Sequence, residues 1–133
     1  MNRSGYSDDI DTWALIRWRG AVKSAIRGER GQRTLREILA ALDAMPEKTL
    51  AAEVLVTAEG EYCTLGALGA SRGIDLTNID PDESDAVAAA FGIAPALARE
   101  IVYENGDSWH KETPHARWHR MREWVKSNIK AGG

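Results

Sequence analysis

YCTLGALGASRGID, residues 62–75, is the stretch that decides the fold, because it holds the chain's only cysteine and three of its twelve glycines. Glycines at this spacing suit either a loop that cradles phosphate or a helix that packs closely against a neighbour. The stretch has no G-x-G-x-x-G motif, and no Lys-Ser or Lys-Thr pair follows its last glycine as in a P-loop. We therefore predict a helix over residues 64–72 and favour close packing over ligand contact.

The three glycines of this stretch lie near one face of the predicted helix: Gly66, Gly69 and Gly73. An interior glycine costs a helix about 1 kcal/mol relative to alanine, so we expect a close backbone contact to compensate. Cys63 precedes the helix, where backbone amides and the helix dipole stabilise a thiolate. Two interpretations of Cys63 stay open: a nucleophile whose base is a histidine, or a buried small hydrophobe. Its apolar neighbours favour the second interpretation.

The length and composition indicate one domain, residues 1–133, with residues 1–9 as a flexible N-terminal arm. The chain is 44% hydrophobic and 28% charged, which is ordinary for a soluble protein. No window is apolar enough for a membrane span, and the N-terminus lacks the apolar core of a signal peptide. A single cysteine cannot crosslink the fold, so we expect a reducing, cytoplasmic location.

The net charge of −3 conceals a strong segregation of charge along the chain. Residues 1–36 carry a net charge of +4, residues 37–107 carry −11, and residues 108–133 carry +4. Basic ends and an acidic middle segment can attract each other within one fold. They can also present faces of opposite sign to partners.

Hydrophobic periodicity predicts helices along most of the chain. The first starts near Thr12 and is interrupted by the glycines of RGERGQR, and the second, which follows them, ends at Pro46. Asp80-Pro81 and Thr113-Pro114 are typical helix starts, with an N-cap followed by proline. Asn105-Gly106 is a typical left-handed helix stop.

Residues 51–63 are the exception to this helical pattern. Val54, Val56 and Thr57 favour strand, and Glu59-Gly60 favours a turn. The predicted fold class is therefore mainly α: a compact bundle of about six helices, with one short β-hairpin near 51–63 as an optional addition.

Basic residues crowd the segment 17–36, which contains a single acid, Glu29. The candidates for partner contact among them are Arg17, Arg19, Lys23, Arg27, Arg30 and Arg33. Arginine matches the geometry of phosphate, and the interleaved Trp13 and Trp18 offer stacking surfaces. Two alternatives stay open: a surface that binds a partner, and a solvated face that pairs with the acidic middle segment. The partner can be a nucleic acid or an acidic protein patch, and the net negative charge weakens the first.

Trp109 and His110 lie in a polar loop and form the second candidate contact site, because exposed tryptophan is enriched at interfaces. The alternative is that Trp109 folds back onto the helices. His115 and His119 could share a metal ion with His110 or Cys63, but no HExxH or CxxC motif accompanies them. The first turn of a helix also disfavours cations. We therefore expect no metal ion and no other cofactor, and we assign no catalytic residue.

Four segments are the most distinctive of the chain: RGxRGQxxLREILAALDAMPEK, EYCTLGALGASRGID, AFGIAPALAREIVYEN and ETPHARWHRMREWV. In this order they resemble a group of small hypothetical proteins encoded by bacteriophages and prophages. The resemblance covers most of the chain, from about Arg17 to Ile129, and CTLGALG and REIVYEN are its most specific parts. It implies a phage accessory protein inside a bacterial cell, and it implies no activity or catalytic residue.

Small phage proteins without catalytic motifs often inhibit host machinery, as anti-CRISPR and other anti-defence proteins do. By this analogy, we expect a protein that binds and modulates or inhibits a host macromolecular complex by occupying its surface, without catalysis. The acidic residues Asp80, Asp82, Glu83 and Asp85 offer a second mechanism, in which they mimic phosphate in a basic groove. The alternative function is a nucleic-acid-binding regulator that uses the basic residues, and the third is a cysteine-dependent enzyme that uses Cys63. A homodimer is compatible with the apolar helices, and no membrane partner is expected.

Overall fold

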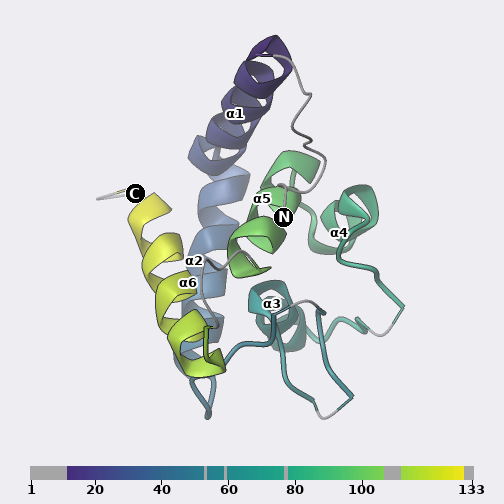
Figure 1. Ribbon diagram of the computed structural model, residues 1–133, viewed down its shortest axis with the longest axis vertical. Helices are drawn as coiled ribbons and strands as arrows, with labels where there is room; N and C mark the ends of the chain where they lie inside the picture. The colour runs from purple at the N-terminus through teal and green to yellow at the C-terminus, as the bar shows by residue number, and fades with distance from the viewer. Residues whose placement is uncertain (1–11, 53, 59, 77, 107–111, 131–133) are drawn as a thin grey trace.

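The computed structural model describes residues 12–52, 54–58, 60–76, 78–106 and 112–130. These residues form six helices: α1 (Thr12–Arg27), α2 (Glu29–Ala44), α3 (Thr64–Arg72), α4 (Ser84–Phe91), α5 (Pro95–Gly106) and α6 (Pro114–Asn128). α2 packs against α3 and α6, while α5 packs against α1 and α4 (Figure 1). The prediction of a compact, mainly α bundle of six helices is confirmed. The predicted N-terminal arm, residues 1–9, lies outside the described residues.

The apolar stripe of α2 forms the middle of the core. Leu35, Ile38 and Leu42 are fully buried, because residues three and four apart share one face of a helix. α6 places Met121 and Val125 against the same core, again without exposure to solvent. In both helices, apolar residues spaced three and four positions apart in the sequence form the buried face.

The glycines of α3 confirm the prediction of close packing at two of three positions. A Cβ atom on Gly66 would overlap the carbonyl oxygen of Leu55, and one on Gly69 would lie 2.7 Å from a methyl carbon of Leu76. Gly73 has another role, since its φ of 72° makes it the left-handed cap that ends the helix.

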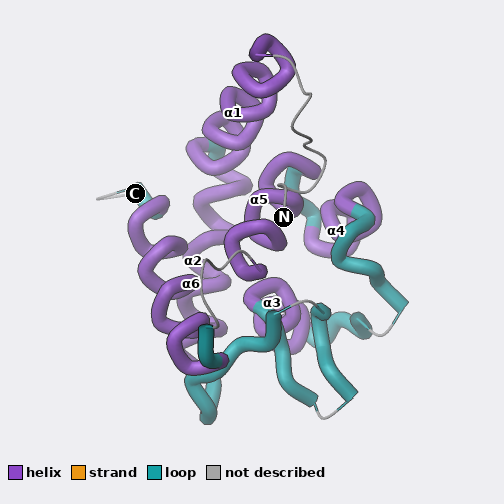
Figure 2. Tube along the Cα trace, in the orientation of Figure 1, coloured by secondary structure: helices purple, strands orange, loops and turns teal. Residues whose placement is uncertain are grey.

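The predicted β-hairpin near 51–63 is wrong, because no residue in the described part of this segment belongs to a strand. The chain does reverse there, with a turn at Gly60 at a φ of 84° and a single antiparallel bridge between Val56 and Tyr62. Figure 2 shows this segment as loop beside α3. The bridge is made by the hydrogen bonds from Cys63 N–H to the carbonyl of Leu55 and from Thr57 N–H to that of Glu61. One further bond, from Ala51 N–H to the carbonyl of Tyr62, joins the two sides of the segment without forming a strand.

Three helix ends differ from the prediction. α2 begins at Glu29, so that Gly31 lies inside the helix, where a Cβ atom would overlap the carbonyl oxygen of Ala25. α4 begins at Ser84, because Asp80 instead closes a tight turn in which Glu83 N–H donates to its carbonyl. α5 ends at Gly106, which is not among the described glycines with positive φ, so the stop is not left-handed.

Gln32 joins the corner between α1 and α2 to the end of α6. Its Nε2 donates to the carbonyl oxygens of Ile26 and Asn128 at 2.8 and 2.9 Å, and its Oε1 accepts from Lys130 N–H at 2.8 Å. The residue is only 4% exposed. One buried side-chain amide thus links the N-terminal helices to the C-terminal end of α6.

Replacing Gln32 with alanine should lower the free energy of unfolding by about 2 kcal/mol, because a buried side chain loses three hydrogen bonds to partly buried backbone groups. Urea denaturation followed by circular dichroism measures this difference. Arg33→Ala is the matched control, since its side chain is exposed on the same helix, and it should change stability by less than about 0.5 kcal/mol. Equal stability of the two variants would contradict a structural role for Gln32.

Among the described residues, no single helix is long and apolar enough to cross a membrane. α4 and α5 reach the required length and composition only jointly, across a bend of 106°.

Candidate functional site

The basic side chains of α1 and the first half of α2 are exposed. We call them together the basic surface: Arg17, Arg19, Lys23, Arg27, Arg30, Arg33 and Arg36. None of these side chains forms an ion pair with a residue that the structure describes. The four-residue spacing of Arg19, Lys23 and Arg27 places them along one side of α1. The structure therefore brings the predicted basic contact residues together on two consecutive helices.

Two acidic residues of the middle segment pair with arginines outside the basic surface. Glu37 accepts from Arg72 at 2.8 and 2.9 Å, and Asp43 accepts from Arg122 at 2.7 Å. These hydrogen bonds lower the pKa of both carboxyl groups, and Arg33 adds only a weaker attraction to Glu37. Among the described residues, no ion pair therefore joins the basic surface to the acidic middle segment.

Trp18 does not serve the basic surface as a stacking platform. Its ring is partly buried, and the guanidinium carbon of Arg99 on α5 lies 4.5 Å from the ring centroid. This cation–π contact attaches α1 to α5. The side chain of Trp13 lies outside the described residues, as do Trp109 and His110, the second predicted contact site. Ile16, 53% exposed, gives the basic surface an apolar element beside Arg17.

Cys63 is the N-cap of α3 and is buried. Its Sγ accepts a hydrogen bond from Gly66 N–H at 3.3 Å, and the residue is only 5% exposed. Burial raises the pKa of the thiol to about 11, although the hydrogen bond from Gly66 acts in the opposite direction. The geometry supports the interpretation of Cys63 as a buried small hydrophobe that also caps a helix.

The native thiol of Cys63 should therefore react slowly. Because its pKa rises from 9.0 to about 11, the thiolate fraction near pH 8 should fall about 100-fold. We expect alkylation by iodoacetamide at pH 8, followed by mass spectrometry, to be at least about 100-fold slower in the native protein than in urea. Equal rates in the two states would restore the hypothesis of a cysteine nucleophile.

His115 and His119 form an exposed pair on α6. Their Nε2 atoms lie 3.1 Å apart, and Nδ1 of His115 lies 3.0 Å from the carbonyl oxygen of Lys48. Cys63, in contrast, is enclosed in the core. No group of three side chains suited to a metal ion occurs among the described residues. The structure therefore does not bring Cys63 and these histidines together as a metal site or as a nucleophile with its base.

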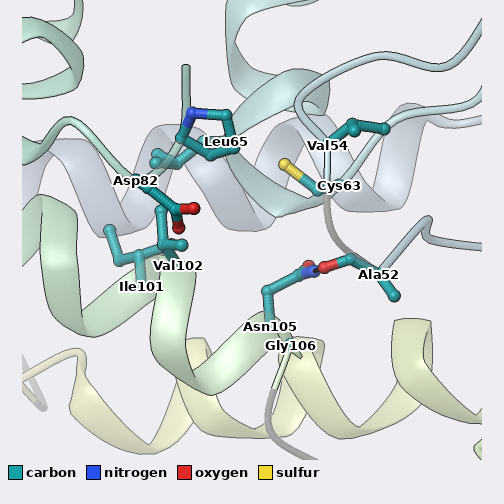
Figure 3. A pocket seen from close by; sticks show the side chains of 10 residues that line it. Ala52, Val54, Cys63, Leu65, Asp82, Ile101, Val102, Asn105 and Gly106 are labelled. Carbon is teal, nitrogen blue, oxygen red and sulfur yellow. Dashed lines mark hydrogen bonds between the residues drawn. The ribbon is translucent and has the colours of Figure 1, made fainter. Parts of the chain in front are cut away.

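A cavity of about 320 Å³ lies beside α3, bounded by α5 and by the loops on either side of α3. Its apolar walls are formed mainly by Val54, Leu65, Pro81, Ile101 and Val102. Three polar side chains complete the lining, namely Cys63, Asp82 and Asn105 (Figure 3). Sequence analysis missed this cavity because its residues come from four separate segments and form no local motif.

Asn105 is the second feature that the sequence did not reveal. Its Oδ1 accepts from the backbone N–H and hydroxyl of Thr64 at 2.9 and 2.7 Å, and its Nδ2 donates to the carbonyls of Ala51 and Ala52. The residue is 2% exposed, and the two bonds with Thr64 are shielded from water, whereas those to Ala51 and Ala52 are partly buried. Asn105 thereby fixes the floor of the cavity and joins α3, α5 and the loop before α3.

Comparisons with known proteins give no match for this chain, whether against protein-family models, curated proteins or solved structures.

Proposed function

We propose that this protein is a phage-type accessory protein that binds a host macromolecular complex in the bacterial cytoplasm and modulates or inhibits it. It acts by occupying a surface, in the manner of anti-defence and anti-CRISPR proteins, and it performs no catalysis. The basic surface of α1 and α2 makes the contact, and Trp109 and His110 stay a predicted secondary contact.

One observation supports this proposal above the others. Seven exposed cations on two consecutive helices have no ion pair within the described part of the chain, while Glu37 and Asp43 pair with other arginines. Concentrating like charge on one surface costs free energy through mutual repulsion, and an oppositely charged partner removes that cost. The buried, weakly acidic thiol of Cys63 argues against the enzyme alternative.

The partner proposed first is an acidic protein face. The chain as a whole carries a net charge of −3, which opposes approach to the dense charge of a nucleic acid. Ile16, exposed among the cations, adds an apolar contact that suits a protein better than a phosphate backbone.

A nucleic-acid-binding regulator is the second candidate, and the shape of α1 favours it. This helix extends beyond the other helices (Figure 1). The spacing of Arg19, Lys23 and Arg27 places these cations along one side of it. A protruding basic helix fits the major groove of a duplex. Such binding would weaken steeply with salt, because the cations displace counterions from phosphate.

Affinity capture from a host lysate, with and without nuclease, separates the two candidates. We expect mass spectrometry to identify one stoichiometric protein complex whose capture survives nuclease. The triple charge reversal Arg19→Glu, Lys23→Glu and Arg27→Glu should abolish this capture, whereas loss of capture after nuclease would favour the nucleic-acid candidate.

A matched pair of single variants controls for nonspecific charge effects. Lys23→Glu should weaken capture several-fold, whereas Lys126→Glu, an exposed lysine on α6, should leave it unchanged. Capture that persists in the triple variant would contradict the proposed surface. If reversal of Asp80, Asp82 and Asp85 abolished capture instead, the phosphate-mimic mechanism would replace it.

A further inference from the structure

Of the three polar side chains described in the lining of the cavity beside α3, two already form hydrogen bonds within the protein. Sγ of Cys63 accepts from Gly66 N–H, and the side-chain amide of Asn105 uses both of its polar atoms on Thr64, Ala51 and Ala52. Neither side chain is therefore available as a strong partner for a ligand. Among the described lining residues, Asp82 is the polar side chain left to recognise a ligand.

The carboxylate of Asp82 is free to bind. It forms no hydrogen bond or ion pair with a residue that the structure describes, since the hydrogen bond of Asp82 within the turn comes from its backbone N–H. Figure 3 shows this carboxylate on one side of the cavity, across from Val54 and Ala52. Asp82 itself is exposed, so solvent weakens the attraction between its carboxylate and a cation, and burial of an apolar group on the neighbouring walls must add to the binding.

The apolar lining and the volume of the cavity determine which group can bind beside Asp82. Leu65 and Ile101 are buried, and Val54 is 42% exposed at the rim, so an apolar group can enter from solvent. The volume of about 320 Å³ lies at the lower end of the range for small-molecule sites. It is sufficient for a flexible alkyl chain of a few carbons, with its charged end beside Asp82.

We propose that this cavity binds an alkylammonium group, with the ammonium on the Asp82 carboxylate and the alkyl stem against Val54, Leu65, Ile101 and Val102. A free primary amine and a lysine side chain of a protein share this chemistry. The inference does not rest on the basic surface, which lies on α1 and α2.

The test uses three probes of similar length in an NMR titration of the full chain: n-pentylamine, 1-pentanol and a doubly capped lysine. Pentylamine should shift the methyl resonances of Val54 and Val102 saturably, and pentanol, which lacks the charge, should bind at least about tenfold more weakly. Tighter binding of the capped lysine than of pentylamine would identify a protein side chain as the natural source. Weaker binding would identify a free amine, and both results support the ammonium site.

Two matched variants test whether the carboxylate of Asp82 is the group that binds the ammonium. Asp82→Asn should weaken pentylamine binding about tenfold and leave pentanol unchanged, whereas Asp85→Asn, exposed in α4 and outside the cavity, should change neither. The proposal is overturned if pentylamine does not saturate, if pentanol binds equally well, or if Asp82→Asn binds the amine like the native chain. Because each variant removes one exposed carboxylate, both should fold normally.

Discussion

Replacing Gly66 with alanine should lower the free energy of unfolding by at least about 3 kcal/mol, although the change adds a single methyl group. The added Cβ atom would overlap the carbonyl oxygen of Leu55 and would lie 3.2 Å from the Cβ atom of Tyr62. The first of these atoms belongs to the backbone, so no change of side-chain rotamer can relieve the overlap.

Relief requires α3 and the loop before it to move apart. The same carbonyl of Leu55 accepts a hydrogen bond from Cys63 N–H at 3.2 Å, and Leu55 is only 2% exposed. Movement would therefore break that bond and open the core around Leu55. The gain in intrinsic helix propensity from glycine to alanine, about 1 kcal/mol, is too small to compensate.

Gly20→Ala is the matched control for this prediction. Gly20 lies in α1, where a Cβ atom would have none of its described neighbours within 4 Å, so the same substitution should stabilise the protein by up to about 1 kcal/mol. Gly69→Ala should fall between the two, because the atoms that crowd it belong to the flexible side chain of Leu76. Urea denaturation measures all three differences. Equal effects of Gly66→Ala and Gly20→Ala would contradict the close packing of α3.

Structural features that depend only on residues close together in the sequence were predictable. Thr113 caps α6 through a hydrogen bond from Ala116 N–H at 3.0 Å, with proline at the next position, and both signals are local. The buried stripe of α2 follows from its helical period alone. The α1 part of the basic surface was also predictable, because Arg19, Lys23 and Arg27 keep their four-residue spacing within one helix whatever the rest of the fold does.

Features that depend on distant segments were not predictable. Val54 and Val56 have strand propensity, but a strand needs a paired neighbour, and the segment opposite them forms only one bridge. Asn105 was predicted as a helix stop, whereas the structure uses its amide to join segments more than 40 residues away. The cavity has the same origin, since packing alone brings Asp82, Val54 and Ile101 into the lining of one cavity.

Replacing Asn105 with alanine is the second substitution with a large expected effect. The side chain makes four hydrogen bonds in a buried site, two with Thr64 and one each with the carbonyls of Ala51 and Ala52. Alanine makes none of them, and Thr64, fully buried, has no water to replace the lost acceptor. Because each buried polar group left unsatisfied costs about 1–3 kcal/mol, we expect a loss of about 3–4 kcal/mol in the free energy of unfolding.

Asn128→Ala is the matched control, because the Asn128 side chain makes one hydrogen bond, from Nδ2 to the carbonyl of Trp124 at 2.8 Å, and is only partly buried. It should lower the free energy of unfolding by less than about 1 kcal/mol. Hydrogen exchange locates the effect of Asn105→Ala: protection should fall first at Thr64 and Cys63, where α3 begins, and later in α2. If Asn105→Ala were no less stable than Asn128→Ala, the four hydrogen bonds would not be the link that holds α3, α5 and the loop before α3 together. A loss of protection that began in α1 would equally contradict this role, because no hydrogen bond of Asn105 reaches that helix.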